Sequence, residues 1–438
     1  MTRKMLLAMA CAMTVAGAAR AETRGPPPSG EPVVTYVVRR GDRLWTLADR
    51  YFVRRPTWRE VRVRNHVRNV RRLTIGLTLE IPTRLLKVEP IEAHLGAFRG
   101  AVTIGGGAAA LGMLVPEGAV VATQGGAFAR LDLPDGSRVS VPSQSRLRVD
   151  ALRRILLTGA VERAFTVLSG RSESTVTPLT GPQDSYRVRT PVSVAAVRGT
   201  DFRVVYAPDD NLASTGVVEG QVGVEAGGGS AVAPAGFGVA VKPGAPPDVV
   251  PLLPAPALVE PGRVQDAPEV SFDVGAVAGA RGYRLQLAAD AGMLDIFAER
   301  SGDSPHLQFD GLPDGDYFVR ATALDPAWIE GLPRTYAFER ALNTLTALGV
   351  APSGTKGDRR FLIKWEAAGA GERTYRVQVV RVGSTEGPVV DAGGLKETQL
   401  TVTNLPPGDY RWQVMSATFR NGRYIEKWSV PQTFTVAE

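Results

Sequence analysis

Two short stretches in the C-terminal half, Ala280-Arg-Gly-Tyr283-Arg-Leu-Gln-Leu287 and Glu372-Arg-Thr-Tyr375-Arg-Val-Gln-Val379, carry the same pattern of residues. Each is followed by a matching turn segment, Gly311-Leu-Pro-Asp-Gly-Asp-Tyr317 in the first copy and Asn404-Leu-Pro-Pro-Gly-Asp-Tyr410 in the second. The two tyrosines are 34 residues apart in the first copy and 35 in the second. Alternating apolar and polar residues predict β-strands, and the repeat predicts two copies of one β-domain.

We assign the two copies to residues 263–342 and 346–438, each as a β-sandwich. Trp365 lies in an alternating stretch, and Tyr317 and Tyr410 each follow a turn that contains Pro and Gly. On these features both copies resemble fibronectin type III-like domains. The resemblance implies that Trp365 is a core aromatic and that both tyrosines lie near a tyrosine corner. It also implies that the domains act as spacers or protein-contact surfaces.

The composition of the 438-residue chain is that of a folded protein with several domains. At about 100–200 residues per domain, the length predicts three or four domains. Hydrophobic residues make up 44% and charged residues 22%, which excludes wholesale disorder. The 48 glycines and 32 prolines favour short strands and turns over long helices. We therefore expect a mainly β, multidomain protein.

Cysteine and histidine are too scarce for several kinds of chemistry. The only cysteine is Cys11, and the three histidines, His66, His94 and His306, are far apart in the sequence. This excludes a disulfide framework and argues against a metal centre, a cysteine nucleophile or a histidine-based triad. We predict no cofactor, no metal and no catalytic residue. A wall-degrading enzyme stays open as an alternative, although glycoside hydrolysis needs two positioned carboxylates.

Residues 1–21 have the features of a secretory signal peptide. Arg3 and Lys4 precede an uncharged apolar run, and Ala19-Arg20-Ala21 supplies small residues at the cleavage site. The alternative is a membrane anchor that is retained, but the run is shorter than the roughly 20 residues of a spanning helix. We expect export to the periplasm, with no integral membrane segment after cleavage. A Pro/Gly-rich linker, residues 22–32, follows.

Residues 33–84 are predicted to contain a strand, two short helices and a closing strand. Thr57 to Glu60 has the pattern of a capping box, and Asn65 fits the left-handed residue at a helix C-terminus. The module resembles the LysM family in residues Tyr36, Val38, Gly41, Asp42, Leu44, Trp45, Asn65, Gly76, Leu79, Ile81 and Pro82. LysM domains have a βααβ fold and bind the N-acetylglucosamine units of peptidoglycan or chitin in a shallow groove.

The LysM resemblance places that groove between two loops of the module. The candidate carbohydrate-binding residues are Gly41, Asp42, Arg43, Leu44, Asn69, Val70, Leu73, Thr74 and Ile75. Leu44 and Leu73 are expected to form its apolar wall. Arg43 and Ile75 depart from the family pattern, which usually has Thr or Ser at the first position and Pro at the second. A LysM fold with a blunted site therefore stays open.

Arginine dominates the charge of this module. Between Arg39 and Arg72 there are twelve arginines and three acidic residues. Peptidoglycan stems carry carboxylates, so a basic module gains association rate and retention near them. Nucleic acid is the other polyanion to consider, and export argues against it as a partner.

Residues 95–242 show an ordered series of β motifs. In order along the chain, they are Leu133-Pro-Asp-Gly-Ser137, Thr190-Pro191, Val197-Arg-Gly-Thr-Asp-Phe-Arg-Val204, Glu219-Gly-Gln-Val-Gly-Val224 and Gly236. This series resembles the FecR family, which implies an all-β, solenoid-like domain with Gly199 in a tight backbone path. The best-known members span the inner membrane and control a cytoplasmic sigma factor. We expect this chain to lack their membrane helix, and we assign a stiff Pro-rich linker to residues 243–262.

Together these features predict a non-catalytic envelope protein. It would bind peptidoglycan through residues 33–84 and present its FecR-like and sandwich domains to an envelope protein that the sequence does not identify. The alternative is a periplasmic sensor or regulatory component of a trans-envelope signalling system that acts through the FecR-like domain.

Overall fold

The computed structural model describes residues 32–354 and 359–437, and its regular structure is mainly β-strand, as predicted. The chain divides into two compact units, one ending at Leu86 and the other beginning at Lys87. The expected signal peptide, residues 1–21, and all of the expected linker before Pro32 lie outside the described residues. Within the described ranges, no helix combines the length and the apolar character that a bilayer crossing demands.

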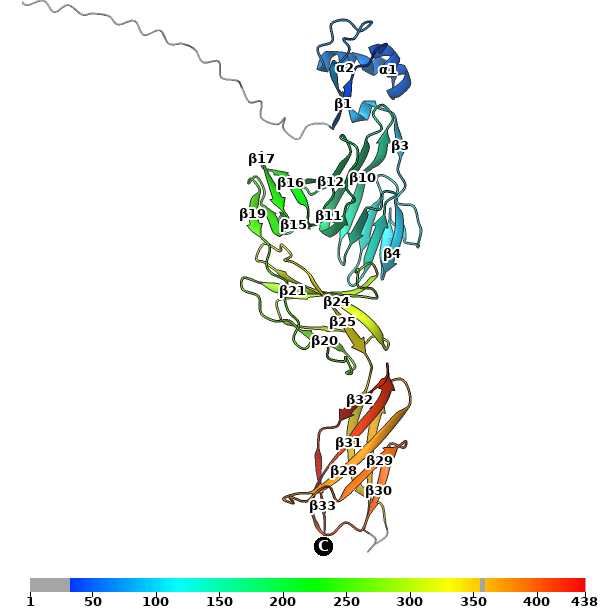
Figure 1. The fold of residues 1–438 in the computed structure, drawn as a ribbon, viewed down its shortest axis with the longest axis vertical. Helices are drawn as coiled ribbons and strands as arrows, with labels where there is room; N and C mark the ends of the chain where they lie inside the picture. Colours follow the sequence, from blue (N-terminus) through cyan, green and yellow to red (C-terminus); the bar gives the residue numbers. More distant parts are fainter. Residues whose placement is uncertain (1–31, 355–358, 438) are drawn as a thin grey trace, which may run out of the picture. The chain divides into compact units, whose positions relative to one another are not determined.

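The N-terminal module, residues 32–86, has the order strand, helix, helix, strand. Its elements are β1 (Val33–Val37), α1 (Leu44–Tyr51), a 3-10 turn η1 (Arg55–Thr57), α2 (Trp58–Arg64), β2 (Thr78–Pro82) and a second 3-10 turn η2 (Thr83–Leu85) (Figure 1). Strands β1 and β2 pair antiparallel. Leu44 of α1, Val61 of α2 and Leu79 of β2 are fully shielded from solvent, so both helices and the strand pair contribute to the core of the module.

Two local predictions for this module are wrong. Thr57 does not cap α2, because its backbone is already helical and its hydroxyl donates to the Arg54 carbonyl oxygen. Glu60 forms an ion pair with Arg84 instead of closing a capping box. The left-handed residue after α2 is His66, at φ 51°, and not Asn65, at φ −97°.

Asn65 has a different part in the module. Its side-chain amide donates to the carbonyl oxygens of Val61 and Glu80, and its side-chain oxygen accepts from the Glu80 backbone N–H. One side chain therefore joins the end of α2 to strand β2 with three hydrogen bonds.

A central domain, residues 88–251, contains seventeen strands. They are β3 (Val88–Pro90), β4 (His94–Arg99), β5 (Val102–Ile104), β6 (Gly107–Ala108), β7 (Val120–Thr123), β8 (Phe128–Asp132), β9 (Arg138–Val141), β10 (Arg146–Ile155), β11 (Val161–Thr175), β12 (Ser185–Arg189), β13 (Val194–Val197), β14 (Asp201–Ala207), β15 (Leu212–Glu219), β16 (Gln221–Ala226), β17 (Gly229–Pro234), β18 (Phe237–Val241) and β19 (Asp248–Pro251).

Strand β11 belongs to two layers of this domain. Its first half pairs with β10 and β12, and its second half pairs with β9 and β14. The hairpins that follow alternate between the layers: β12–β13 and β16–β17 extend one sheet, while β14–β15 and β18–β19 extend the other. Apolar side chains from both layers, such as Leu147, Phe165 and Phe202, form one core between them.

Gly199 lies at a connection where the backbone path is tight. Its φ is +118°, and an added Cβ would lie 2.8 Å from the Cα of Pro178. Any other residue there would be strained and would collide with backbone.

The expected linker at residues 243–262 is not a free tether. Its residues 248–251 form β19, which pairs with β18, and Leu252 and Leu258 are buried. Strand β19 runs antiparallel to β18 and extends the sheet of the central domain.

Two sandwiches follow the central domain. The first contains β20 (Val270–Asp273), β21 (Gly282–Ala288), β22 (Ile296–Gly302), β23 (His306–Phe309), β24 (Gly315–Leu324) and β25 (Arg334–Arg340). The second contains β26 (Thr344–Pro352), β27 (Arg360–Ala368), β28 (Arg373–Arg381), β29 (Val390–Leu395), β30 (Gln399–Thr403), β31 (Gly408–Arg420), β32 (Arg423–Trp428) and β33 (Gln432–Val436).

The internal repeat is visible in the strand pairing of the sandwiches. Strand β21 lies between β22 and β24 just as β28 lies between β29 and β31. Trp365 is 1% exposed and belongs to the core of the second sandwich. The hydroxyl of Tyr317 donates to the Pro313 carbonyl oxygen, and that of Tyr410 donates to the Pro406 carbonyl oxygen, the contact of a tyrosine corner.

Candidate functional site

The two loops expected to form the sugar groove lie next to each other in the N-terminal module. The backbone N–H of Leu44 donates to the carbonyl oxygen of Val70 at 3.3 Å. The N–H of Gly76 donates to the Val38 carbonyl oxygen at 2.9 Å and closes the second loop onto the end of β1. The structure therefore brings together residues 41–44 and 69–75.

Most candidate groove residues are exposed or half-buried, but two of them are buried. Gly41, Arg43, Asn69, Thr74 and Ile75 are exposed, and Asp42 and Val70 are half-buried. Leu44 and Leu73 are buried in the core, so the prediction that they form an apolar wall is wrong. Ile75, which is 65% exposed, is the apolar side chain that the loops present to solvent.

Asp42 holds the first loop in shape. One of its carboxylate oxygens accepts from the Tyr36 hydroxyl and from the Arg39 backbone N–H, both at 2.7 Å. Burial and this hydrogen bond raise the pKa of Tyr36 to about 12. Asp42 therefore positions the loop, and a sugar would meet the loop backbone and its exposed side chains.

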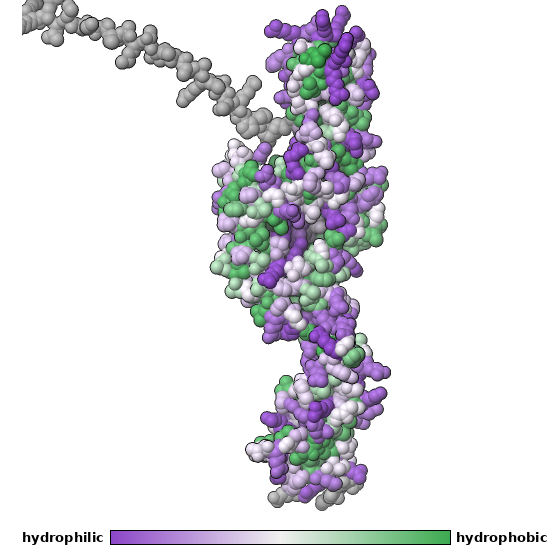
Figure 2. All heavy atoms as spheres, viewed as in Figure 1, coloured by the Kyte–Doolittle hydropathy of each residue, from purple (hydrophilic) through white to green (hydrophobic). Residues whose placement is uncertain are grey.

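The arginines make the surface around these loops strongly basic, and Figure 2 shows hydrophilic side chains projecting from the module. Arg55 pairs with Asp49 at 2.9 Å. Arg43 lies over Trp45 and Arg59 over Trp58, with guanidinium-to-ring distances of 5.9 and 5.5 Å. These stacked arginines keep their charge at the surface.

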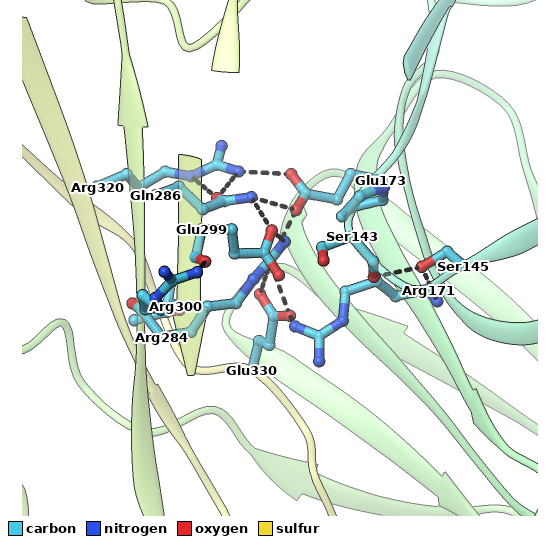
Figure 3. Close-up of polar contacts among 12 residues, drawn as sticks. Ser143, Ser145, Arg171, Glu173, Arg284, Gln286, Glu299, Arg300, Arg320 and Glu330 are labelled. Atoms are coloured by element: carbon cyan, nitrogen blue, oxygen red, sulfur yellow. Dashed lines mark hydrogen bonds and ion pairs between the residues drawn. The ribbon is translucent and has the colours of Figure 1, made fainter. Parts of the chain in front are cut away.

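A second polar cluster, which sequence reasoning missed, joins the central domain to the first sandwich. Figure 3 shows Arg171 and Glu173 of β11 extending toward Arg284 and Arg320 of the sandwich. We name this set the ion-pair cluster; its members are Arg171, Glu173, Arg203, Arg284, Gln286, Glu299, Arg320 and Glu330.

Arg284, which is 1% exposed, lies at the centre of this cluster. Its Nη1 contacts Glu173 and Glu330, both at 2.8 Å, and its Nη2 contacts Glu299 at 2.6 Å. Glu330 also accepts from Arg171 at 2.7 Å. These ion pairs join the two domains, because Glu173 of the central domain contacts Arg284 of the sandwich, and Glu330 of the sandwich contacts Arg171 of the central domain.

The neighbouring charges determine how these groups titrate. Burial alone would raise the pKa of Glu173, but Arg320 and Arg284 outweigh it and hold that pKa well below its ordinary value. Burial likewise opposes ionisation of Glu330, and Arg284 and Arg171 hold its pKa below the ordinary value. Both glutamates are therefore ionised at neutral pH.

Apolar contacts flank the ion-pair cluster. Phe128 of the central domain packs with Met293 and Ile296 of the first sandwich. Ile329 lies against Gly238 on β18, where an added Cβ would lie 2.7 Å from its methyl carbon. The missing side chain at Gly238 is what lets the sandwich approach the sheet so closely.

The internal repeat explains why the sequence did not reveal this cluster. Gln286 pairs with Glu299 across β21 and β22, and in the second sandwich Gln378 pairs with Asp391 in the equivalent register. Arg376, the counterpart of Arg284, forms an exposed ion pair with Asp391 at 2.6 Å. The same strand pattern is thus solvent-facing in one copy and covered in the other, and no local signal separates the two.

Comparison with known proteins identifies one region of the chain. A FecR domain lies in residues 119–223. These residues match the family described as FecR protein, and they fall inside the expected span of 95–242. No curated protein matches the chain.

Solved structures show weaker similarity. One is a protein assigned as an anti-sigma factor from Parabacteroides distasonis, with 18% identity over 30% of this chain and a TM-score of 0.25. The chain spans 57% of the length of that protein. Two fibronectin type III domains of chicken tenascin match at 17% identity over 43% of this chain and 99% of theirs, with a TM-score of 0.24. Fibronectin type III-like modules of CbhA from Clostridium thermocellum match at 10% identity over 41% and 92%, with a TM-score of 0.21.

Proposed function

We propose that this chain is an exported, non-catalytic envelope protein that binds peptidoglycan through a LysM-like domain, residues 33–84. The observation that carries the proposal is the hydrogen bond from Leu44 to Val70, which holds the two candidate loops together. Acetamide groups of N-acetylglucosamine need backbone donors and acceptors beside an apolar contact. The exposed loop residues with Ile75 supply that combination, and the surrounding arginines favour a carboxylate-bearing polymer.

Co-sedimentation with purified, insoluble sacculi tests the proposal. We expect the full-length protein to pellet and a fragment that begins at Lys87 to stay in the supernatant, because only the former carries the candidate groove. N-acetylglucosamine oligomers in solution should compete with the sacculi. Full-length protein that stays in the supernatant at low salt would refute peptidoglycan binding.

A matched pair of variants separates groove contacts from general charge. Ile75→Asp changes an exposed aliphatic side chain in the groove, and Val63→Asp makes the same change on α2, where Val63 is 70% exposed. We expect the first variant to lose binding and the second to keep it at 1 M salt, where the Debye length is about 3 Å. Equal losses in both variants would show that charge, and not the groove, holds the polymer.

The FecR domain favours a second function, a regulatory role in envelope signalling. The family match over residues 119–223 carries this candidate. We propose that the central domain and the first sandwich together present a surface to an envelope protein in the periplasm. Comparison of transcripts in a deletion strain and its complemented parent tests this role, and unchanged transcription under envelope stress would count against it.

We propose that the chain is not an enzyme. In the part of the chain that the structure describes, histidine, aspartate and glutamate side chains form no group of three that is arranged to hold a metal ion. Release of soluble fragments from labelled sacculi by the purified protein, abolished by a single carboxylate substitution, would overturn this part of the proposal.

A further inference from the structure

A cleft of about 120 Å³ lies between the central domain and the first sandwich, beside the ion-pair cluster. The central domain contributes Arg130, Arg138 and Ser140 to its walls, and the sandwich contributes Arg320. Arg130 lies across from Ser140 in the β8–β9 ladder, and Ser140 lies across from Glu173 in the β9–β11 ladder. The strand register therefore places these polar groups side by side on one sheet face.

Charged side chains dominate the cleft walls, and three of the four guanidinium groups already face a carboxylate. Four guanidinium groups line the cleft, against the two carboxylates of Glu173 and Asp201. Arg130 is held by Asp132 at 2.8 Å, and Arg320 by Glu173 at 2.6 Å. A third guanidinium, that of Arg203, lies 3.5 Å from Glu330.

Arg138 is the guanidinium whose charge stays unmatched. Among the residues that the structure describes, none forms an ion pair with Arg138, and none accepts or donates a hydrogen bond at the Ser140 hydroxyl. Asp132 is the cross-strand neighbour of Arg138, but both of its carboxylate oxygens accept from Arg130. Asp201 accepts from the Thr175 hydroxyl at 3.0 Å.

We propose that this cleft binds a small oxyanion, a phosphate or carboxylate group, between Arg138 and Ser140 on one side and Arg320 on the other. A guanidinium binds such groups through two parallel N–H···O hydrogen bonds. An unpaired positive charge in a partly enclosed cleft attracts an anion more strongly than one in open solvent. The space of about 120 Å³ limits the bound group to a small one.

A ligand in this position would contact two domains at once. Arg138 belongs to β9 of the central domain, and Arg320 belongs to β24 of the first sandwich. A ligand that binds only the docked arrangement stabilises that arrangement by mass action. The cleft would thus let an envelope anion tighten the junction between the FecR domain and the sandwich.

Thermal unfolding of the purified protein with titrated anions tests the site. Inorganic phosphate and sodium acetate are compared with sodium chloride at equal ionic strength and pH. Arg138→Ala removes the proposed contact at an exposed position. Arg146→Ala, which removes an exposed strand arginine outside the cleft lining, is the matched control.

We expect phosphate, acetate or both to raise the unfolding midpoint of the wild type and of Arg146→Ala above the chloride value. Calorimetric titration should show the affinity for that anion reduced about tenfold or more in Arg138→Ala. A response to phosphate alone assigns a phosphate ligand, and a response to acetate alone assigns a carboxylate. No response beyond chloride in the wild type, or an equal response in Arg138→Ala, would overturn the proposal.

Discussion

The buried guanidinium of Arg284 depends on carboxylates to balance its charge. It is 1% exposed and contacts three carboxylates, Glu173, Glu299 and Glu330, from both sides of a domain boundary. Burying such charges is costly, and a buried ion pair often stabilises no more than apolar residues of similar size. Loss of one partner is different, because it leaves an uncompensated charge away from water.

Glu330→Gln should therefore destabilise the protein. The amide keeps the shape of the side chain but leaves Arg171 and Arg284 without the carboxylate that joins them. We expect a loss of about 3–5 kcal/mol in the free energy of unfolding, measured by urea titration. Asp310→Asn is the control, since that side chain is 99% exposed, and its urea midpoint should not change. A small effect of Glu330→Gln would mean that the cluster is hydrated in solution.

Acid should weaken the same junction. The folded-state pKa values of Glu173 and Glu330 lie below the unfolded value of about 4.3. Between the folded and unfolded pKa values, the unfolded state binds more protons than the folded state. The contribution of these glutamates to stability is therefore full above the unfolded pKa of about 4.3 and is lost as the pH falls through the folded pKa values. We expect the urea midpoint to decline as the pH falls below about 4.3, with a shallower decline in Glu173→Gln. Equal slopes in the wild type and the variant would contradict the assignment.

At the scale of the elements, the close approach of the first sandwich to the central domain depends on Gly238 in β18. Gly238→Ala places a methyl group 2.7 Å from Ile329 and 3.0 Å from Leu252, where something must move. We expect this overpacking to cost about 1–3 kcal/mol in the free energy of unfolding, measured by urea titration.

Gly223→Ala in β16 is the matched control for that substitution. It also adds one methyl group to a strand glycine of the central domain, but its nearest neighbour, the Ala196 carbonyl oxygen, is 3.8 Å away. We expect the control to keep the wild-type urea midpoint or to exceed it slightly. Equal destabilisation by both substitutions would show that strand geometry, and not the domain junction, sets the requirement for glycine.

At the scale of the whole molecule, the chain should unfold in more than one step. It divides into two compact units at Leu86, and the ion-pair cluster lies entirely in the second unit. We expect calorimetry to resolve a transition for the N-terminal module, and Glu330→Gln should shift only the other transition. A single transition that moves as a whole in the variant would contradict independent unfolding.

The second unit should itself unfold cooperatively across its domains. Besides the ion-pair cluster, Glu339 of the first sandwich pairs with Arg420 and Arg423 of the second, and Asn343 accepts from the buried Ser416 hydroxyl. These contacts cross the domain boundary that the sequence predicted between residues 342 and 346. Because of these contacts, we expect the two sandwiches to unfold together and not as independent domains.

Strand positions in the repeat followed from the sequence alone. Alternation around Tyr283 and Tyr375 predicted strands, and β21 and β28 lie there, because the period of two is a local property of an extended backbone. The FecR motifs likewise carried enough local turn and strand chemistry to place the domain that the family match finds in residues 119–223. The mainly β class is confirmed for the same reason.

Only the tertiary structure decided which strand faces are buried. Arg284 and Arg376 occupy the same place in the repeat, yet one is enclosed and the other is half-exposed beside Asp391. The carboxylate of Glu173, which helps to enclose Arg284, comes from a strand 111 residues earlier in the chain. Whether a polar face meets water or another sheet depends on which domain packs on it, and no pattern within the strand records that. For the same reason the sequence placed Leu44 and Leu73 at a groove wall, although the fold buries them in the core.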